Sequence, residues 1–416
     1  MSQYVITGGR RLEGELQIDG SKNAVLPIIA ATLLNEDITY INNCPKILDV
    51  KIMIEILEQL GCHIEWQEQT LVIDTRHLSN YILNESLVKK MRSSIILLGA
   101  LMGRCGEAQI SQPGGCQLGA RPINLHLEAL KKMNVDISEV EGIIHCKTLH
   151  LQGAKINLKF PSVGATENIM LAAAKGEGVT IIYNAAREPE IVDLQDFLVS
   201  CGAKVEGAGT STILIQGVTR LSGTTYQVIP DRIIAGTYLT AAAMTRGTII
   251  LNDVRNEHLV TMTEKLEMMG CQIIHEKNRV ILSSPKVLKG INIITEPHPG
   301  FPTDMQSQMM ALLCTCQGST FIKENLFEAR FKIVDELNKM GAAIKIKDCT
   351  AYIEGEKALH GETICAKDLR GGAALVLAGL VAEGCTIVKQ IEHIERGYQN
   401  IILDLSKLGA HIQERK

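Results

Sequence analysis

Aromatic side chains are scarce in this sequence of 416 residues and make up only 4% of it. Hydrophobic residues still account for 46%, so the core must be built mainly from Ile, Leu, Val, Ala and Met. An excess of charge of one sign is also lacking, because the formal net charge is only -4. Proteins that bind nucleic acids or membrane surfaces carry clustered basic residues, and we therefore expect neither partner.

Long hydrophobic runs are missing as well. No stretch reaches the length of a membrane-spanning helix, and the N-terminal segment MSQYVITGGRRLEGEL lacks the apolar part of a secretion signal. We therefore expect a cytoplasmic protein. The chain also lacks the G-x-x-x-x-G-K-[ST] and G-x-G-x-x-G motifs, which disfavours an ATPase or a dinucleotide-dependent enzyme.

Cysteine pairs of the C-x-x-C type are absent, although the chain has 12 cysteines. Scattered cysteines in a long cytoplasmic chain favour reduced and mostly buried thiols over disulfides. A zinc site is disfavoured, because H-E-x-x-H and paired C-x-x-C motifs are both missing. We expect no metal and no cofactor.

A sixfold repeat is the clearest pattern that is present. An apolar helical stripe is followed by Gly or Asn and then by an alternating strand pattern. The copies read LEQLGCHIE, LKKMNVDIS, LVSCGAKVE, LEMMGCQII, LNKMGAAIK and LSKLGAHIQ. Gly and Asn are the residues that tolerate the left-handed conformation at the end of a helix. These turn residues recur every 68 to 73 positions, at Gly61, Asn134, Gly202, Gly270, Gly341 and Gly409.

Each repeat predicts two kinds of helix. In the first copy, apolar residues between Val50 and Leu60 lie on one helical face, and residues 63–73 alternate like a strand. A second pattern, clearest in IMLAAAKGEGVTIIYNAA, predicts a helix of small residues followed by a turn and a β-branched strand. The small-residue helices carry few charges, so we expect them to be buried on all sides.

The repeats predict an α/β protein of two domains, each built from three repeats of about 70 residues, which are too short to bury their faces alone. The alternative is one long solenoid. The first strands, within residues 4–18, precede the first repeat, and we expect them to pair with the C-terminal group. Crossovers near residues 20–21 and 228–231 would give one domain of residues 22–229 and another of residues 1–21 plus 230–416. A small-ligand site is expected in a cleft between such lobes.

The segment QPGGCQLGARPINLHLEALKKM carries the main candidate nucleophile. Cys116 lies in a glycine-rich loop ahead of a helix that we expect to begin at Pro122. Arg121 and the helix N-terminus both favour the thiolate form of this cysteine. The plainer alternative is a small apolar residue in a turn, which is the commoner role of a free cysteine.

Several basic residues are candidates for binding an anion. Lys22 and Asn23 lie in GSKNAVLPI at the first expected crossover, and Arg396 lies in HIERGY. Arg92 and Arg370 each open a small-residue helix, where an anion is favoured by the helix N-terminus. The alternative is ordinary surface charge.

Two further helix starts carry polar candidates. Asp304 follows two prolines in PGFPTDMQ, where the commonest role of an aspartate is to cap the helix. Ser162, Val163 and Gly164 precede a helix in PSVGATENIM, and backbone amides in such a position suit a phosphate.

These segments occur in the same order as those of a known family. The chain closely resembles the UDP-N-acetylglucosamine 1-carboxyvinyltransferases over its whole length. The resemblance rests on GSKNAVLPI, MRSS, PGGCQLGARPINLH, SVGAT, NAAREPEIVD, PDRI, HPGFPTDMQ, FEARF, DLRGGAALVLAG and HIERGY. It implies the inside-out α/β barrel fold, with two domains of three repeats each. It also implies transfer of the enolpyruvyl group of phosphoenolpyruvate to the 3′-hydroxyl of UDP-N-acetylglucosamine, with release of phosphate, in the first committed step of peptidoglycan synthesis.

The resemblance implies a catalytic role for several residues. Lys22, Arg121 and Arg396 would bind the phosphate and carboxylate of phosphoenolpyruvate. Cys116 would be the general acid and would also attack C2 to form a covalent adduct, which makes it the target of fosfomycin. Asp304 would be the base near the sugar hydroxyl.

The resemblance also implies the residues around these. Arg370 would order the closed site and hold the carboxylate. The remaining UDP-sugar contacts would be Asn23, Arg92, Pro122, Asn124, Leu125, Ser162, Val163, Gly164 and Leu326. Two positions depart from the family pattern, which often has Asp at the position of Asn124 and Lys at that of Phe160.

Two rival functions differ in class. One is 5-enolpyruvylshikimate-3-phosphate synthase, an enzyme of similar fold, against which PGGCQLGARP and SVGAT argue. The other is a non-catalytic sensor of the sugar nucleotide, against which the intact catalytic set argues. We expect no obligate protein partner.

Overall fold

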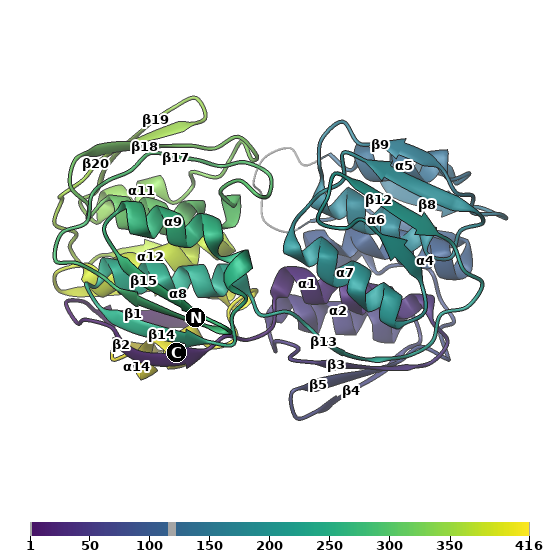
Figure 1. The fold of residues 1–416 in the computed structure, drawn as a ribbon, viewed down its shortest axis with the longest axis horizontal. Coiled ribbons are helices and arrows are strands. Elements are labelled where there is room, and N and C mark those ends of the chain that lie inside the picture. Colours follow the sequence, from purple (N-terminus) through teal and green to yellow (C-terminus); the bar gives the residue numbers. More distant parts are fainter. Residues whose placement is uncertain (1, 115–121, 416) are drawn as a thin grey trace. The chain divides into compact units, whose positions relative to one another are not determined.

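The computed structural model describes residues 2–114 and 122–415, and the chain separates into two units (Figure 1). The middle unit comprises residues 20–114 and 122–229, and the terminal unit comprises residues 2–19 and 230–415. Each unit has its own cluster of buried apolar side chains. The alternative of one long solenoid is therefore wrong. The architecture is mixed α/β, as the repeats predict.

The middle unit contains three sheets, of which two are mixed and one, β6-β8-β7, is antiparallel. The first has the order β13-β3-β5-β4, formed by Thr225–Gln227, Ile38–Asn42, Thr70–Asp74 and His63–Gln67. The second has the order β6-β8-β7, formed by Glu107–Ser111, Ile143–Lys147 and Asp136–Val140. The third has the order β11-β12-β10-β9, formed by Lys204–Glu206, Thr212–Gln216, Val179–Tyr183 and Lys155–Asn157.

The terminal unit contains three mixed sheets. The first has the order β21-β22-β1-β23, formed by Thr363–Cys365, Cys385–Lys389, Gln3–Thr7 and His411–Arg415. The second has the order β15-β16-β14-β2, formed by Gln272–Glu276, Arg279–Ser283, Thr248–Asn252 and Glu13–Gln17. The third has the order β17-β18-β20-β19, formed by Ile293–Ile294, Ser319–Lys323, Thr350–Glu354 and Ala343–Lys347.

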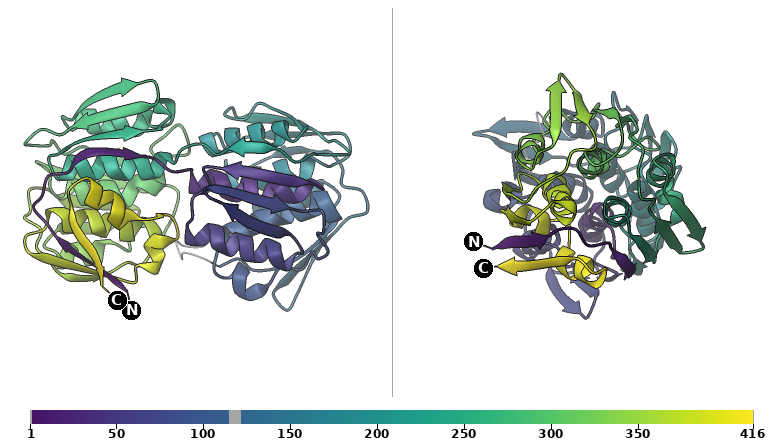
Figure 2. Two further views of the ribbon diagram at one scale, coloured as in Figure 1. Left: turned by 90° about the horizontal axis from the view of Figure 1, so that it is seen from below. Right: turned by 90° about the vertical axis from the view of Figure 1, so that its left-hand side faces the viewer.

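The first two strands of the chain complete sheets of the terminal unit. Strand β1 lies between β22 and β23 and pairs antiparallel with both, with Tyr4 opposite Val388 and Glu414. Strand β2 pairs parallel with β14. The two chain ends consequently lie side by side (Figure 2). The predicted pairing of the first strands with the C-terminal group is confirmed.

The small-residue helices are buried on all sides, as predicted. In α12, every residue from Leu369 to Leu380 is buried. Contacts among these helices occupy the centre of each unit, where α4 packs on α1 and α6, and where α8, α10 and α12 pack on one another. The helices are α1 (Lys22–Ala31), α4 (Leu97–Cys105), α6 (Val163–Ala173), α8 (Arg232–Met244), α10 (Gln306–Leu313) and α12 (Leu369–Val381).

The close approach of α4 and α6 depends on glycine. A Cβ atom at Gly99 would lie 2.2 Å from the carbonyl oxygen of Asn168. The backbone N–H of Gly99 instead donates to Oδ1 of Asn168 at 2.6 Å. A side chain at position 99 would therefore push the two helices apart.

The amphipathic helices end before the six repeated turn residues. These residues have φ between +68° and +108°, so the predicted left-handed conformation is confirmed. The helices are α2 (Leu48–Gln59), α5 (Asn124–Lys132), α7 (Pro189–Ser200), α9 (Val260–Met268), α11 (Val334–Lys339) and α14 (Ile401–Lys407). Shorter helices are α3 (Glu85–Val88), α13 (Glu392–Glu395), η1 (Thr32–Leu34), η2 (Arg92–Ile96), η3 (Asn256–His258) and η4 (Thr303–Met305).

Two local predictions are wrong in detail. Residues 63–73 form the hairpin of β4 and β5 rather than one strand, because Glu68 turns the chain with a φ of +54°. Helix α5 begins at Asn124, two residues after the expected Pro122. The carbonyl of Ile123 accepts the first helical hydrogen bonds, from His126 and Leu127, so Pro122 lies outside the helix.

The segments that enter and leave the middle unit are held by backbone hydrogen bonds. In the middle unit, Ser21 N–H donates to the carbonyl of Ile229 at 2.8 Å. In the terminal unit, Asp231 N–H donates to the carbonyl of Asp19 at 2.9 Å. Across the part of the chain that the structure describes, no helix combines the length and the apolar character needed to cross a membrane.

Candidate active site

Lys22 opens α1 and is almost completely buried, with 8% of the residue exposed. Its Nζ lies 3.1 Å from Oδ2 of Asp49, which lies in the first turn of α2. The hydroxyl of Ser21 caps α1 by accepting a hydrogen bond from the N–H of Ala24. The alternative of a surface lysine is therefore wrong. A buried ammonium group must be paired with a carboxylate, and Asp49 supplies it.

Further carboxyl groups lie close to this lysine in the middle unit. Glu167 on α6 is fully enclosed, and its burial, followed by the charges of Glu190 and Glu188, raises its pKa to about 8. The positive charge of Lys22 acts on this pKa in the opposite direction. Glu167 is consequently protonated at neutral pH, which limits the negative charge around Lys22.

The predicted UDP-sugar residues lie on elements that contact one another. Ser162 caps α6, with its hydroxyl accepting from the N–H of Ala165 at 3.4 Å. Arg92 opens η2, which packs on both α1 and α6, and its Nη1 donates to the carbonyl of Pro113 at 3.2 Å. Helices α5 and α6 also pack together. The structure thus brings together the neighbourhoods of Lys22, Asn23, Arg92, Asn124, Leu125, Ser162, Val163 and Gly164.

One side chain joins α5 to α6 next to this group. A Cβ atom at Gly164 would lie 3.1 Å from Cε1 of His126, so the imidazole lies against the first turn of α6. Nδ1 of His126 lies 2.6 Å from Nδ2 of Asn168. Because the amide nitrogen can only donate, Nδ1 of His126 is the acceptor and carries no proton. Sequence reasoning gave no role to either residue.

Asp304 is the centre of the site residues in the terminal unit. Its Oδ1 accepts a hydrogen bond from Nη2 of Arg330 at 2.9 Å, and its Oδ2 accepts one from Nη2 of Arg370 at 3.0 Å. The side chain of Asp304 is 27% exposed, whereas those of both arginines are 3% exposed. Asp304 lies in η4, and no side-chain cap is formed there, so the helix-cap alternative is wrong.

Two donor nitrogens of the Arg370 guanidinium group are available for further hydrogen bonds. Arg370 is the second residue of α12, and its Nε and Nη1 are buried without a hydrogen-bond partner among residues 2–114 and 122–415. Burial lowers its pKa, but the charge and hydrogen bond of Asp304, together with the electrostatic effects of Tyr398 and Asp231, outweigh this, so the pKa of Arg370 is raised. The guanidinium group is therefore a permanent cation with two unused donors, which suits an anionic ligand.

Leu326 and Arg396 lie on elements that adjoin this group. The carboxylate of Glu324 accepts from the N–H of Leu326 at 2.8 Å and from the hydroxyl of Thr303 at 3.0 Å, so it ties the Leu326 turn to η4. Arg396 directly follows α13, which packs on α12. The predicted residues Asp304, Leu326, Arg370 and Arg396 are thus close in the fold of the terminal unit.

Sequence reasoning gave no role to Arg330, although the FEARF segment contains it. Its Nη2 also donates to the carbonyl of Thr303 at 3.1 Å, and its guanidinium carbon lies 5.8 Å from the ring centre of Phe327. The sequence singles out Arg330 only through the family resemblance. The ion pair of Arg330 with Asp304 depends on how η4 and the loop after β18 fold, which the sequence does not show directly.

Two predicted residues, Cys116 and Arg121, lie outside the described residues. Of the 11 other cysteines, all free, seven are buried, which agrees with the expected mostly buried thiols. Burial raises the pKa of several of them, including Cys201 to about 12. Phe160, at one of the departures from the family pattern, is 45% exposed. Within residues 2–114 and 122–415, no cluster of three or more His, Cys, Asp or Glu side chains is arranged to hold a metal ion.

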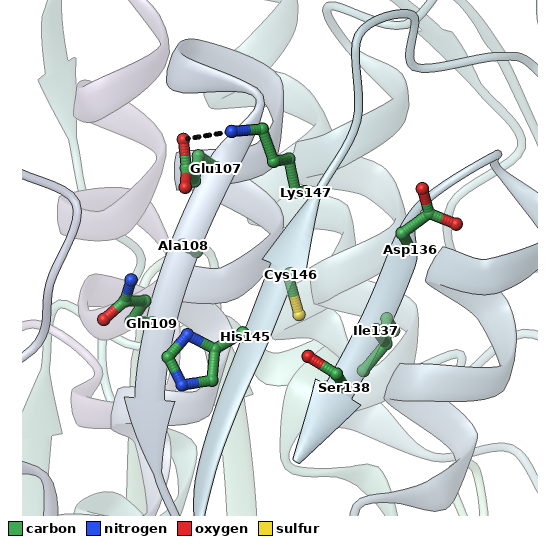
Figure 3. Close-up of a pocket in the computed structure, with 9 residues that line it drawn as sticks. All are labelled: Glu107, Ala108, Gln109, Asp136, Ile137, Ser138, His145, Cys146 and Lys147. Carbon is green, nitrogen blue, oxygen red and sulfur yellow. Dashed lines mark hydrogen bonds and ion pairs between the residues drawn. The ribbon is translucent and has the colours of Figure 1, made fainter. Parts of the chain in front are cut away.

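Two surface cavities lie away from the predicted residues. One, of about 300 Å³, lies on the sheet β6-β8-β7, where Glu107, His145 and Lys147 line it (Figure 3). Lys147 there pairs with Glu107 at 3.4 Å. The other, of about 500 Å³, lies on the sheet that contains Phe321 and Tyr352. No described residue of the predicted site lines either cavity.

Comparisons with known proteins agree on one family. Residues 6–405 match the model of the EPSP synthase (3-phosphoshikimate 1-carboxyvinyltransferase) family. The UDP-N-acetylglucosamine 1-carboxyvinyltransferase 2 of Caldanaerobacter subterraneus subsp. tengcongensis is 49% identical over 413 residues, which is 99% of each chain. The UDP-N-acetylglucosamine 1-carboxyvinyltransferase 1 of Carboxydothermus hydrogenoformans is 46% identical over 99% of this chain and 98% of its own.

Solved structures show the same fold. The enolpyruvyl transferase NikO from Streptomyces tendae superposes with a TM-score of 0.91 at 25% identity, over 99% of this chain and 98% of its own. EPSP synthase from Acinetobacter baumannii superposes with a TM-score of 0.76 at 19% identity over the whole of both chains. The family model, the sequence relatives and the shared fold lead to one conclusion: the chain belongs to the UDP-N-acetylglucosamine 1-carboxyvinyltransferases, a group of enolpyruvyl transferases within the EPSP synthase family.

Proposed function

We propose that this protein transfers the enolpyruvyl group of phosphoenolpyruvate to the 3′-hydroxyl of UDP-N-acetylglucosamine and releases phosphate. This is the first committed step of peptidoglycan synthesis and places the enzyme in the cytoplasm. The names of relatives that are 46% and 49% identical over nearly the whole chain support the substrates. The observation that carries the chemistry is the pairing of Asp304 with two buried arginines, one of which keeps two unused donors.

The proposed fold is a two-domain inside-out α/β barrel with three repeats in each domain. One domain comprises residues 22–229 and carries Cys116 and the UDP-sugar contacts. The other comprises residues 1–21 plus 230–416 and carries Asp304, Arg370 and Arg396. Buried central helices and three sheets in each unit support this assignment.

The first chemical requirement is to bind a highly charged substrate. Phosphoenolpyruvate carries about three negative charges within a few ångströms, which only several cations in a water-poor site can hold. Lys22, Arg121 and Arg396 bind its phosphate and carboxylate. Arg370 adds its Nε and Nη1 to the carboxylate while its Nη2 stays on Asp304. The same cations stabilise the departing phosphate.

The second requirement is acid–base chemistry on opposite sides of the double bond. The sugar hydroxyl must add to C2 of phosphoenolpyruvate while C3 takes up a proton, which gives a tetrahedral ketal. Asp304 accepts the hydroxyl proton, and the guanidinium groups of Arg330 and Arg370 hold its carboxylate in place. Cys116 donates the proton to C3. In the second step C3 gives up a proton as phosphate leaves C2, and this restores the alkene. The role of Cys116 rests on the sequence.

The third requirement is to hold the acceptor. Asn23, Arg92, Pro122, Asn124, Leu125, Ser162, Val163, Gly164 and Leu326 contact the sugar nucleotide. The first turn of α6 offers backbone N–H groups next to Ser162, where an anionic diphosphate is favoured. Asn124 provides a neutral amide where the family often has a carboxylate.

Phosphate release with two alternative acceptors tests this function. The purified enzyme is incubated with phosphoenolpyruvate and either UDP-N-acetylglucosamine or shikimate 3-phosphate. We expect release only with the sugar nucleotide, and the Asp304→Asn variant should lose most of it. Release with shikimate 3-phosphate would instead support the rival synthase, and release with neither acceptor would support a non-catalytic sensor.

Alkylation by fosfomycin tests the role of Cys116. An epoxide phosphonate should bind to the phosphate-binding cations and react with an activated thiolate. Mass spectrometry should find the adduct on Cys116 and not on the exposed Cys105, Cys349 or Cys385, which serve as internal controls. An unmodified Cys116 would contradict the assignment.

A further inference from the structure

Within the described residues, the guanidinium group of Arg370 makes one well-defined hydrogen bond, from Nη2 to Asp304. Its Nε and Nη1 are buried without a partner in the described chain. A single hydrogen bond leaves the plane of a guanidinium group free to rotate about it. Something other than hydrogen bonding must therefore fix the direction in which the two free donors point.

The ring of Tyr398 is the neighbour in a position to do this. The guanidinium carbon of Arg370 lies 5.9 Å from the centre of that ring, within the range of a cation–π contact. Both residues are only 2% exposed. Burial raises the pKa of Tyr398, although Arg370 acts in the opposite direction, so the phenol stays protonated at neutral pH.

The hydroxyl of Tyr398 is held in turn by α8. It lies 2.8 Å from Oγ1 of Thr237. Oγ1 of Thr237 donates its one proton to the carbonyl of Ile233 at 2.8 Å and accepts a hydrogen bond from Nε2 of Gln308 at 3.1 Å. Because the threonine proton is used, Tyr398 must be the donor to Thr237. The threonine hydroxyl then makes all three of its possible hydrogen bonds, so the phenol is fixed in place.

These contacts form a closed path that begins and ends at Asp304. Gln308 lies on α10, which directly follows η4 with Asp304. Gln306, Ser307 and Gln308 are all fully buried at the start of α10, although polar side chains there cost stability compared with apolar ones. A closed path therefore runs from Asp304 through α10 to Gln308, and then through Thr237, Tyr398 and Arg370 back to Asp304.

We infer that Tyr398, held by Thr237 and Gln308, is a positioning residue that fixes the Arg370 guanidinium and, through it, the Asp304 carboxylate. The inference rests on the proposed function and adds three residues to it, none of which touches the reacting atoms. Arg370 can then present Nε and Nη1 to the substrate carboxylate without losing its hold on Asp304.

The test compares two tyrosine-to-phenylalanine variants of the full-length enzyme. Tyr398→Phe removes the hydroxyl and keeps the ring. Tyr238→Phe is the matched control, because Tyr238 lies on α8, is also 2% exposed and donates its hydroxyl to Asp404 at 2.7 Å. Misplaced catalytic groups lower rates steeply, so we expect kcat of Tyr398→Phe to fall about tenfold and KM for phosphoenolpyruvate to rise. KM for the sugar nucleotide should stay within about twofold of wild type, and the control should keep wild-type kinetics.

A double variant provides a second, independent readout. Thr237→Val removes the acceptor of the Tyr398 hydroxyl while keeping the shape of the side chain. If both residues act along one path, Thr237→Val should lower kcat like Tyr398→Phe, and the double variant should lose no more than the worse single variant. If Tyr398→Phe does not fold, the Thr237→Val kinetics decide alone.

The possible outcomes distinguish a failure of this inference from a failure of the proposed function on which it rests. A wild-type enzyme that releases no phosphate would refute the proposed function itself. With an active wild type, unchanged kinetics of Tyr398→Phe would overturn the inference. So would equal losses in Tyr398→Phe and Tyr238→Phe together with equally lowered melting temperatures, since that pattern means general destabilisation.

Discussion

At the scale of single residues, the proposed site depends mainly on buried charged side chains that form ion pairs. Lys22 pairs with Asp49, and Asp304 pairs with Arg330 and Arg370. The family resemblance identified Lys22, Asp304 and Arg370 from the sequence. It gave no role to Asp49 or Arg330, because each is distant in sequence from its partner and meets it only through the packing of separate elements.

Arg330 provides a direct test of this pairing. Arg330→Met keeps much of the apolar length of the side chain and removes one of the guanidinium groups that pair with Asp304. Loss of one preorganised charged donor should lower kcat by about 100-fold. Arg279→Met, on the exposed hairpin β15–β16, is the matched control and should stay within about twofold of wild type. Steady-state kinetics of both variants decide, and a wild-type kcat for Arg330→Met would contradict the role of the pair.

Glu167 gives a prediction about stability and pH. Its carboxyl group has a pKa of about 8 in the folded state, against 4.5 for an ordinary glutamate. Between these two values the unfolded chain has lost this proton while the folded chain still holds it. The contribution of Glu167 to stability is therefore full below pH 4.5 and is lost as the pH rises towards 8.

Glu167→Gln keeps a neutral side chain at every pH and removes this loss. At pH 8 its free energy of unfolding should exceed that of wild type by about 2 kcal/mol or more, while at pH 5 the two should agree within about 1 kcal/mol. Urea unfolding at both values measures this. Glu128→Gln, on the exposed side of α5, should show no such pH dependence. A Glu167→Gln variant no more stable than wild type at pH 8 would show that Glu167 ionises normally.

At the scale of elements, the repeat pattern predicted the helices better than the strands. The spacing of Gly and Asn located the six left-handed turns, because these two residues adopt that conformation at a lower cost than most others. The pattern did not reveal the break at Glu68, because the turn residues Glu68 and Gln69 include none of the Gly, Pro, Asn, Asp or Ser residues that usually signal a turn. It also placed the start of α5 at Pro122, because proline favours the first helical position but does not fix it.

The turns Gly61 and Gly202 differ in one testable respect. Both have φ near +100°, but a Cβ atom at Gly61 would lie 2.7 Å from the carbonyl of His77, whereas one at Gly202 would meet nothing within 4 Å. Gly202→Ala should therefore cost about 1 kcal/mol from backbone strain alone. Gly61→Ala should cost at least about 1 kcal/mol more, because the chain around His77 must shift. Both sites lie in the middle unit, so urea unfolding compares them directly, and equal losses would contradict the steric argument.

At the scale of the whole molecule, the two units differ in how they depend on the chain ends. All described strands of the middle unit come from residues 38–227, whereas the terminal unit takes β1 and β2 from the start of the chain. The strands expected within residues 4–18, which precede the first repeat, predicted that the start of the chain pairs with the C-terminal group. The detail that β1 separates β22 from β23 could not be read from the sequence, because any open edge of the C-terminal sheets would have satisfied the pattern.

Separate expression of the two parts tests this asymmetry. Residues 20–229 contain a complete buried cluster and should melt cooperatively alone. Residues 230–416 lack the strand between β22 and β23, so those strands lose their hydrogen-bond partners. We expect no cooperative melting of this part by circular dichroism until a peptide of residues 1–19 is added. Cooperative melting of residues 230–416 without the peptide would contradict the prediction.

The identity of the reaction product tests the central claim most directly. The enzyme is incubated with UDP-N-acetylglucosamine and phosphoenolpyruvate, and mass spectrometry then follows the sugar nucleotide while free phosphate is measured. We predict a sugar nucleotide that is heavier by one enolpyruvyl group, formed in equal amount to the phosphate. Recovery of the sugar nucleotide unchanged, with or without phosphate release, would contradict this prediction.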